Sequence, residues 1–328
     1  MRCADVISTC LRRVRVCRGW LVWALIAGYV PMAGAQTAYR LRDINVQKQA
    51  NSVLALMGYQ VVPDLTASSL SISDARTGNP DIGMSQLAGG FTISRSTPLY
   101  LEGGIAGSRY NPTFVMTNGT DTAHVPVKWN SLSVTAGVGW DFPTPIPELV
   151  FRPIVNGAYG YMTSDLHAAQ SVLNYVAGTD IEFFNGGQLT AVGYGGSLML
   201  DYEHYRPEGE IDVELRYTNI QLQSTGGASS AVRGHADAQT VGLWARYRAP
   251  TGLHALDRPV RYVLEFAQSA FLGDQRGLLG FNYLTSLGVG LELDSSAYHV
   301  IITRTRLVAR YLFGDNVSGV SVGLAVSF

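Results

Sequence analysis

Hydrophobic and polar side chains alternate with a period of two through the last residues of the chain. One side of this extended segment carries Val320, Val322, Leu324, Val326 and the terminal Phe328. The other side carries only glycine, serine and alanine. Because successive side chains of a strand point to opposite faces, the pattern predicts a strand with one apolar and one small, polar face. Such a strand fits the wall of an outer-membrane barrel, and an edge strand of a soluble sheet is the alternative.

The same alternation recurs along the chain in segments separated by glycine, proline and other turn residues. It predicts twelve strands, near residues 66–75, 84–95, 98–109, 126–141, 149–162, 188–203, 209–223, 236–248, 259–271, 281–293, 299–313 and 318–328. Their connections alternate between short ones, such as 205–208, and longer ones, such as 110–124 and 163–187. Short periplasmic turns and long external loops are typical of outer-membrane barrels. The pattern therefore predicts an all-β fold, a transmembrane antiparallel up-and-down β-barrel of about 12 strands.

A different period precedes the first predicted strand. Apolar residues between Ile44 and Met57 lie at helical spacing, with Asp43 placed to cap the start and Gly58 to close the end. This pattern predicts a short amphipathic helix that the barrel can hold in its lumen. A loose periplasmic segment is the alternative.

The N-terminal region has the pattern of a secretory signal peptide. Five arginines precede an apolar stretch from Trp20 to Val30, which is too short to span a bilayer, and Ala33, Gly34 and Ala35 are small enough for cleavage. A single N-terminal anchor helix is the alternative. The predicted organisation is a signal peptide at 1–35, a helical plug or linker at 36–62 and a barrel at 63–328.

Composition removes several classes of function. Cys3, Cys10 and Cys17 all lie in the predicted signal peptide, so the mature chain has no disulfide, thiolate nucleophile or cysteine metal site. Removing the five arginines and one aspartate of this peptide from 24 basic and 25 acidic residues leaves 19 and 24. A net charge near −5 gives no reason to expect nucleic-acid binding. No spaced histidine and carboxylate motif predicts a metal, and no cofactor is expected.

Charged side chains gather on the predicted lumen face of the strands. The arginines are Arg216, Arg246, Arg248, Arg261, Arg304, Arg306 and Arg310, and the carboxylates are Glu102, Asp201, Glu203, Asp212, Glu214, Glu265 and Glu292. Arginines opposite carboxylates on neighbouring strands can form forked ion pairs in a confined, partly dehydrated space. We interpret them as pairs that hold the wall and fill the interior, with a selectivity filter or ligand site as the alternative.

A catalytic interpretation would need a histidine at the external, lipid-facing rim. The residues predicted there are His124, His167 and His235. No Gly-x-Ser-x-Gly elbow accompanies them. The prediction is therefore a protein that is not an enzyme, with no catalytic residue.

Aromatic residues cluster at the predicted strand ends. Those near short turns are Tyr202, Tyr205, Tyr247, Tyr262 and Phe328, and those near long loops are Tyr161, Tyr217, Tyr311 and Phe313. Such rings sit at the level of the lipid headgroups and fix the height of a barrel in the membrane.

Together, the leader, the short helix, the alternating strands and the terminal Phe328 resemble the translocator domain of autotransporters. The resemblance is strongest to solitary autotransporter-like barrels without a passenger, and it covers roughly residues 40–328. It implies insertion by the barrel-assembly machinery, which reads the last strand, and a helix in the pore that matches Ile44 to Met57. Only about thirty residues separate Gln36 from the first predicted strand, which puts a translocation role in doubt.

The combined prediction is a monomeric barrel in the bacterial outer membrane, surrounded by outer-membrane lipid. Its expected role is structural or that of a narrow pore, with the lumen plugged by the N-terminal helix. The alternatives are an outer-membrane lipid hydrolase and an adhesin-like barrel that displays loops 110–124 and 163–187 to an external partner.

Overall fold

In the computed structural model, residues Thr37–Phe328 form one compact unit, and most of these residues are described. The described residues are 40–41, 54–55, 57–61, 68–73, 82–110, 113–117, 122–126, 128–164, 188–226, 234–276, 281–296, 303–315 and 317–327. The predicted signal peptide, residues 44–53 of the predicted helix and Phe328 lie outside them.

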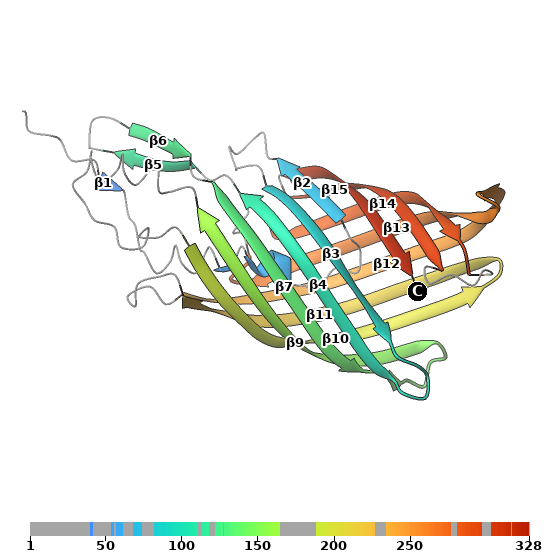
Figure 1. Ribbon diagram of the computed structural model, residues 1–328. Helices are drawn as coiled ribbons and strands as arrows, with labels where there is room; N and C mark the ends of the chain where they lie inside the picture. The colour runs from blue at the N-terminus through green and yellow to red at the C-terminus, as the bar shows by residue number, and fades with distance from the viewer. Residues whose placement is uncertain are drawn as a thin grey trace, which may run out of the picture. The chain divides into compact units, whose positions relative to one another are not determined.

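Twelve of the described strands pair side by side, each antiparallel to its neighbours, and form a closed ring (Figure 1). They are β2 (Ser68–Ser73), β3 (Ile82–Thr92), β4 (Leu99–Tyr110), β7 (Trp129–Trp140), β9 (Leu149–Ser164), β10 (Gln188–Arg206), β11 (Gly209–Gly226), β12 (His235–Ala255), β13 (Arg258–Gly273), β14 (Tyr283–Asp294), β15 (Arg304–Gly314) and β16 (Val317–Ser327). Strand β16 closes the ring by pairing with β2, from Ser318 opposite Ser73 to Gly323 opposite Ser68. The predicted up-and-down barrel of about 12 strands is confirmed.

Four further short strands lie outside this ring and were not predicted. β1 (Arg40–Leu41), β5 (Thr113–Thr117) and β6 (Thr122–Pro126) form a small separate sheet. β8 (Phe142–Pro143) pairs with the start of β9, where Phe142 lies opposite Phe151. Strands of two to five residues are too short to show a recognisable period of two.

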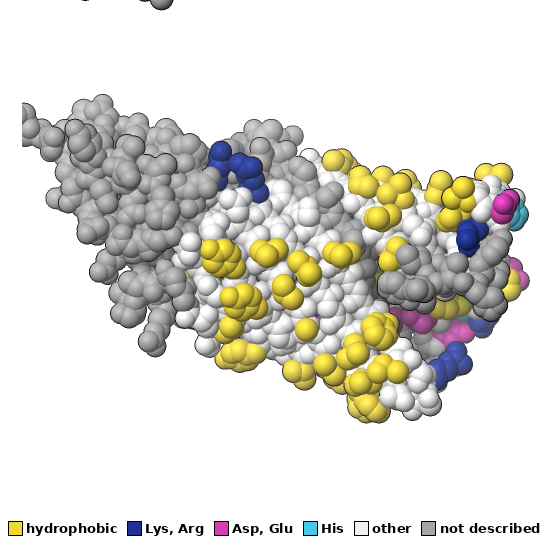
Figure 2. Space-filling model, in the orientation of Figure 1, with side chains coloured by type: hydrophobic (Ala, Val, Ile, Leu, Met, Phe, Trp, Pro, Cys, Tyr) yellow, Lys and Arg dark blue, Asp and Glu magenta, His cyan; other side chains and the backbone are white. Residues whose placement is uncertain are grey.

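The outer surface of the ring is apolar. On β7, Leu132, Val134 and Val138 are about half exposed, and the alternate residues Ser133 and Thr135 are buried. The same alternation runs through β11, β14 and β16. Figure 2 shows hydrophobic side chains spread over one side of the wall, with charged side chains gathered toward its ends. Exposed hydrophobic and buried polar side chains reverse the arrangement of a water-soluble protein, as expected where lipid is the solvent.

A helical segment precedes the ring, and its described residues are 54–55 and 57–61. The predicted helix end at Met57 is wrong, because Gly58 lies within the helix and helical residues continue to Val61. Gly58 serves close packing: a Cβ atom built on it would lie 2.8 Å from the Cβ atom of Ala238. No helix among the described residues is long and apolar enough to cross a membrane.

Candidate functional site

The inward-facing side chains make the barrel lumen the candidate functional site. Charged residues line the lumen toward the short connections, such as the one between β10 and β11. Toward the long loops, the inward side chains are mostly apolar and pack with the helical segment. The lumen therefore has a charged level and an apolar level, each built by alternate residues of the same strands.

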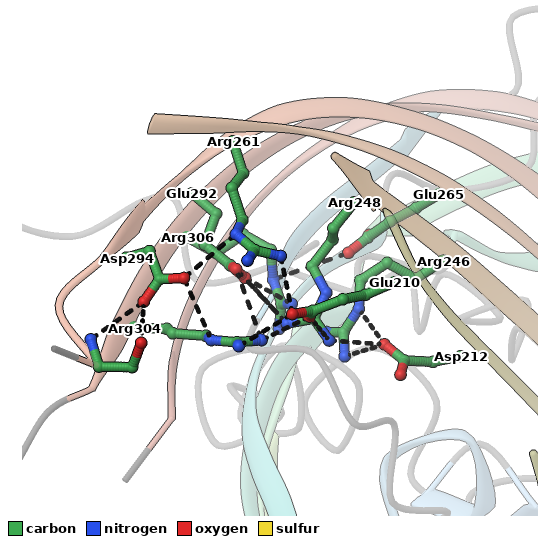
Figure 3. Close-up of polar contacts among 11 residues, drawn as sticks. Glu210, Asp212, Arg246, Arg248, Arg261, Glu265, Glu292, Asp294, Arg304 and Arg306 are labelled. Carbon is green, nitrogen blue, oxygen red and sulfur yellow. Dashed lines mark hydrogen bonds and ion pairs between the residues drawn. The ribbon is translucent and has the colours of Figure 1, made fainter. Parts of the chain in front are cut away.

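Arg248 is the most buried arginine of the charged level, and its side chain is only 2% exposed. Its guanidinium group lies 2.8 Å from Glu210, 3.3 Å from Asp212 and 3.3 Å from Glu292. Figure 3 shows these side chains, from β11, β12 and β14, pointing toward one another. Asp212 also pairs with the neighbouring Arg246. The positive charge of Arg248 on β12 is therefore shared by carboxylates of β11 on one side and of β14 on the other.

Glu210 also forms ion pairs with two arginines from more distant strands. Arg261 on β13 lies 2.7 Å from it, and Arg304 on β15 lies 2.6 Å from it (Figure 3). Both arginines also approach Asp294, at 3.1 Å and 4.0 Å. These contacts join four strands of the wall, β11 and β13 to β15, across the lumen.

The remaining arginines of β15 pair with the acids of β13 and β14. Arg306 lies 3.3 Å from Glu292, and Arg310 donates two hydrogen bonds to Glu265, at 2.8 Å and 2.6 Å. We name the set Glu210, Asp212, Arg246, Arg248, Arg261, Glu265, Glu292, Asp294, Arg304, Arg306 and Arg310 the arginine cluster. Six arginines and five carboxylates thus nearly balance one another's charge in a confined space.

A second contact crosses the lumen between strands that are not neighbours. Arg216 on β11 donates two hydrogen bonds to Glu102 on β4, at 2.8 Å and 2.7 Å. Strands β7, β9 and β10 lie between them in the ring, and inward residues of β9 and β10 complete the contact. Asn156 donates to Glu102 at 2.5 Å, and Ser197 accepts from Arg216 at 2.8 Å. This polar bridge spans the lumen and pairs both of its own charges.

Several lumen residues were not predicted, although the register of their strands carried the signal. Arg152 pairs with Asp141 and, at 2.9 Å, with Asp201, and its guanidinium carbon lies 4.0 Å from the centre of the Tyr100 ring. Arg152 alternates with the outward Phe151 and Val155, so its place in the lumen follows from strand period alone. Glu210 and Asp294 could have been found in the same way.

Two of the predicted lumen carboxylates have acidic neighbours. Glu203 lies directly across from Asp212, and Glu214 directly across from Asp201, in the pairing of β10 with β11. Within the described part of the chain, neither Glu203 nor Glu214 lies within ion-pair distance of an arginine. The other twelve predicted lumen residues are all in ion pairs.

The apolar level holds the helical segment. Leu54, Ala55, Met57 and Val61 are essentially inaccessible to solvent. They share one apolar cluster with inward side chains of five strands, which we name the helix seat: Trp129, Met162, Leu189, Ala191, Ile220, Leu222, Ala236 and Ala238. A Cβ atom on Gly160 of β9 would overlap the sulfur of Met57, so a larger residue there would require the Met57 side chain to move.

Polar and aromatic contacts hold the other sides of the helix. Gln60 donates hydrogen bonds of 2.5 Å to Ser108 of β4 and to Ser131 of β7. The hydroxyl group of Tyr59 donates to the backbone oxygen of Gln275 at 2.7 Å, beyond the end of β13. The Tyr59 ring lies 4.6 Å from that of Phe271.

The short-turn rim carries a small exposed ion pair. Glu148 lies 2.6 Å from His204 and 3.0 Å from Arg206. The hydrogen bond from His204, with a weaker contribution from Arg206, lowers the pKa of Glu148 below its usual value. Tyr205, one of the rings predicted near the short turns, lies near the end of β10 and is 43% exposed, and its ring is 5.4 Å from the guanidinium carbon of the buried Arg248.

The other predicted residues lie on the last strand and at the long-loop ends of the strands. Val320, Val322, Leu324 and Val326 are exposed on the outer face of β16, and Phe328 lies outside the described residues. His235 begins β12 and is exposed. His167 and the side chain of His124 lie outside the described residues. The described residues contain no group of three metal-binding side chains.

Comparison with known proteins finds similarity in structure only. No protein-family model matches the sequence, and a search of curated proteins finds no match. The chain is similar in fold to the β domain of the Bordetella autotransporter BrkA, with 15% identity, a TM-score of 0.42 and coverage of 81% of this chain and 100% of that one. It is also similar to the transport unit of the autotransporter AIDA-I from Escherichia coli, with 12% identity, a TM-score of 0.45 and coverage of 87% and 100%. The translocator domain of autotransporter NalP from Neisseria meningitidis gives 12% identity, a TM-score of 0.41 and coverage of 84% and 94%.

The geometry itself fixes the environment of the barrel. In a closed antiparallel ring, neighbouring strands satisfy one another's backbone hydrogen bonds, which is the condition for a β-structure to span lipid. Its apolar exterior and charged interior match bacterial outer-membrane proteins. The chain forms a twelve-stranded β-barrel with the architecture of bacterial outer-membrane barrels.

Proposed function

We propose that this barrel is a narrow pore held shut by its own N-terminal helical segment. The short turns face the periplasm and the long loops face outward, so the helix closes the external half of the lumen. The observation that carries the proposal is the burial of the helical segment among inward-facing side chains.

The contacts of the helix extend around most of the ring. Gln60 bonds to β4 and β7, the helix seat covers β7 and β9 to β12, and Tyr59 packs on Phe271 of β13. Tyr59 also packs against a pair formed by Phe281 and Val317, which brings in β16. A helix that touches so many strands leaves little of the cross-section free at its level.

The charged level supports a narrow pore even without the helix. The Glu102–Arg216 bridge and the Glu210–Arg304 pair both cross the lumen between strands that are not neighbours. Rings and pairs of charged side chains set the width and the ion preference of many pores. The proposed route is thus restricted twice, first by the helix and then by ion pairs.

We also propose a route for export and membrane insertion of the barrel. Residues 1–35 would direct export and be removed, and the last strand would be read by the barrel-assembly machinery, as the family resemblance implies. The proposed state is a monomer without enzymatic activity and without cofactor.

Deleting residues 44–61 tests the proposed plug. This deletion removes the described helical residues but keeps Arg40 and Leu41, which pair with β5. We expect single-channel conductance in planar bilayers to rise several-fold above that of the full mature chain, while the heat-modifiable gel shift of a folded barrel is retained. Equal conductance of the two proteins would reject the plug.

A further inference from the structure

An apolar groove crosses the outer wall of the barrel in its short-turn half. It has a volume of about 590 Å³ and is lined by residues of β4 and β7 to β11, among them Val138, Trp140, Val155, Leu198 and Tyr217. Gly196 and Pro153 leave the space between these larger side chains open. Such a volume falls in the range of about 300–1,000 Å³ that holds one small ligand.

The position of the groove on the outer face of the barrel favours a lipid as its ligand. Val155 is 74% exposed and Leu198 51% exposed on the same outward face that forms the apolar band of the barrel. The groove is therefore continuous with the lipid-contacting surface, and its side chains offer an acyl chain dispersion contacts without a polar partner.

The rim beneath the groove offers a site for a phosphate group. His204 follows Leu198 on the outward face of β10, and Arg206 lies two residues farther, with a side chain that is 52% exposed. Both basic side chains share the single carboxylate of Glu148. An arginine that is half exposed can bind a phosphate through paired hydrogen bonds.

The distance between groove and rim fits one lipid leaflet. Six residues separate Leu198 from His204, which is about 20 Å along a strand. At the tilt of about 45° usual for barrel strands, this corresponds to a depth of about 14 Å, close to half of the roughly 30 Å hydrocarbon core. A lipid with its phosphate at the rim would therefore place the far part of its acyl chain, near the bilayer midplane, at Leu198.

We infer that the groove and rim form a binding site for one anionic phospholipid of the periplasmic leaflet. Its acyl chain lies between Val155 and Leu198, and its phosphate is held by Arg206 and His204. The inference uses the orientation given under the proposed function but not the plug, because the site lies on the outside of the wall.

Native mass spectrometry of the full mature chain with added phosphatidylglycerol tests the site. We expect one lipid to be retained per chain, and Val155→Trp, which fills the groove, to reduce retention about tenfold, a change worth about 1.4 kcal/mol. The matched control is Val320→Trp, the same change on the outer face of β16, where Val320 is 64% exposed and does not line the groove. This control should retain lipid like the unchanged chain.

Arg206→Gln provides an independent test that leaves the apolar wall intact. Loss of the charge-assisted hydrogen bonds should lower retention of phosphatidylglycerol several-fold more than retention of uncharged diacylglycerol. Equal retention by Val155→Trp and Val320→Trp would overturn the inference. So would a mass spectrum dominated by a dimer without lipid, because a second copy of the chain would then cover the groove. Neither result depends on conductance, so failure of the lipid site and failure of the plug are distinguishable.

Discussion

Replacing Gly160 with leucine is expected to unseat the N-terminal helix and raise the open probability of the pore about tenfold. The position opposite Gly160 is occupied by the side chain of Met57, and even a Cβ atom would overlap its sulfur. Overpacking of a filled interior costs about 1–3 kcal/mol, which shifts a seated helix toward its unseated state by about 5- to 150-fold. Single-channel recording in planar bilayers measures this change.

The matched control for this substitution is Gly157→Leu on the same strand. Gly157 faces outward, and a Cβ atom built on it meets no other atom within 4 Å. A leucine there should add to the apolar exterior and leave conductance unchanged. An equal effect of the two variants would mean that Gly160→Leu acts through the strand and not through the helix.

Replacing Arg248 with methionine is expected to lower the stability of the barrel by about 1–3 kcal/mol, the usual cost of leaving buried polar groups unsatisfied, because each of its carboxylate partners keeps at least one other arginine. The loss would leave Glu210, Asp212 and Glu292 without their shared cation, in a region where the Arg248 side chain is only 2% exposed. Unfolding in urea, followed by the loss of the heat-modifiable gel shift, measures the free-energy change. The expected midpoint lies well below that of the unchanged chain.

Arg206→Met serves as the control for Arg248→Met. Arg206 makes an ion pair with Glu148, but its side chain is half exposed, and exposed pairs contribute only about 0.2–1 kcal/mol. If both variants unfolded at the same urea concentration, the arginine cluster would have no special role in stability.

The barrel could be predicted from the sequence because each strand carries its own signal. On β16 and β11, the alternation of apolar and polar residues gives the face of every side chain without knowledge of any neighbour. Short connections then bring consecutive strands together, so the order of the ring follows from chain order. Strands β5 and β6 were not predicted because five residues show too few alternations of apolar and polar side chains.

The partners inside the lumen could not be predicted in the same way. Strand period places Glu102 and Arg216 in the interior, but their contact joins β4 to β11 across three intervening strands. That contact depends on the curvature and width of the ring, which no local pattern encodes. The helix end was predicted wrongly for a related reason. Glycine often ends a helix, but here Gly58 lies inside the helix and leaves room for the Ala238 side chain of a strand distant in sequence.

Disulfide formation in the Met57→Cys, Gly160→Cys double variant would report whether the helix occupies the lumen in a native membrane. The predicted mature chain has no other cysteine, and the side chain of Met57 already fills the space at Gly160. The control is the Met57→Cys, Gly157→Cys variant, whose second cysteine would face lipid. We expect mild oxidation of isolated outer membranes to give an intramolecular crosslink in the first variant and none in the second. No crosslink in either variant, or equal crosslinking in both, would contradict a helix seated inside the barrel.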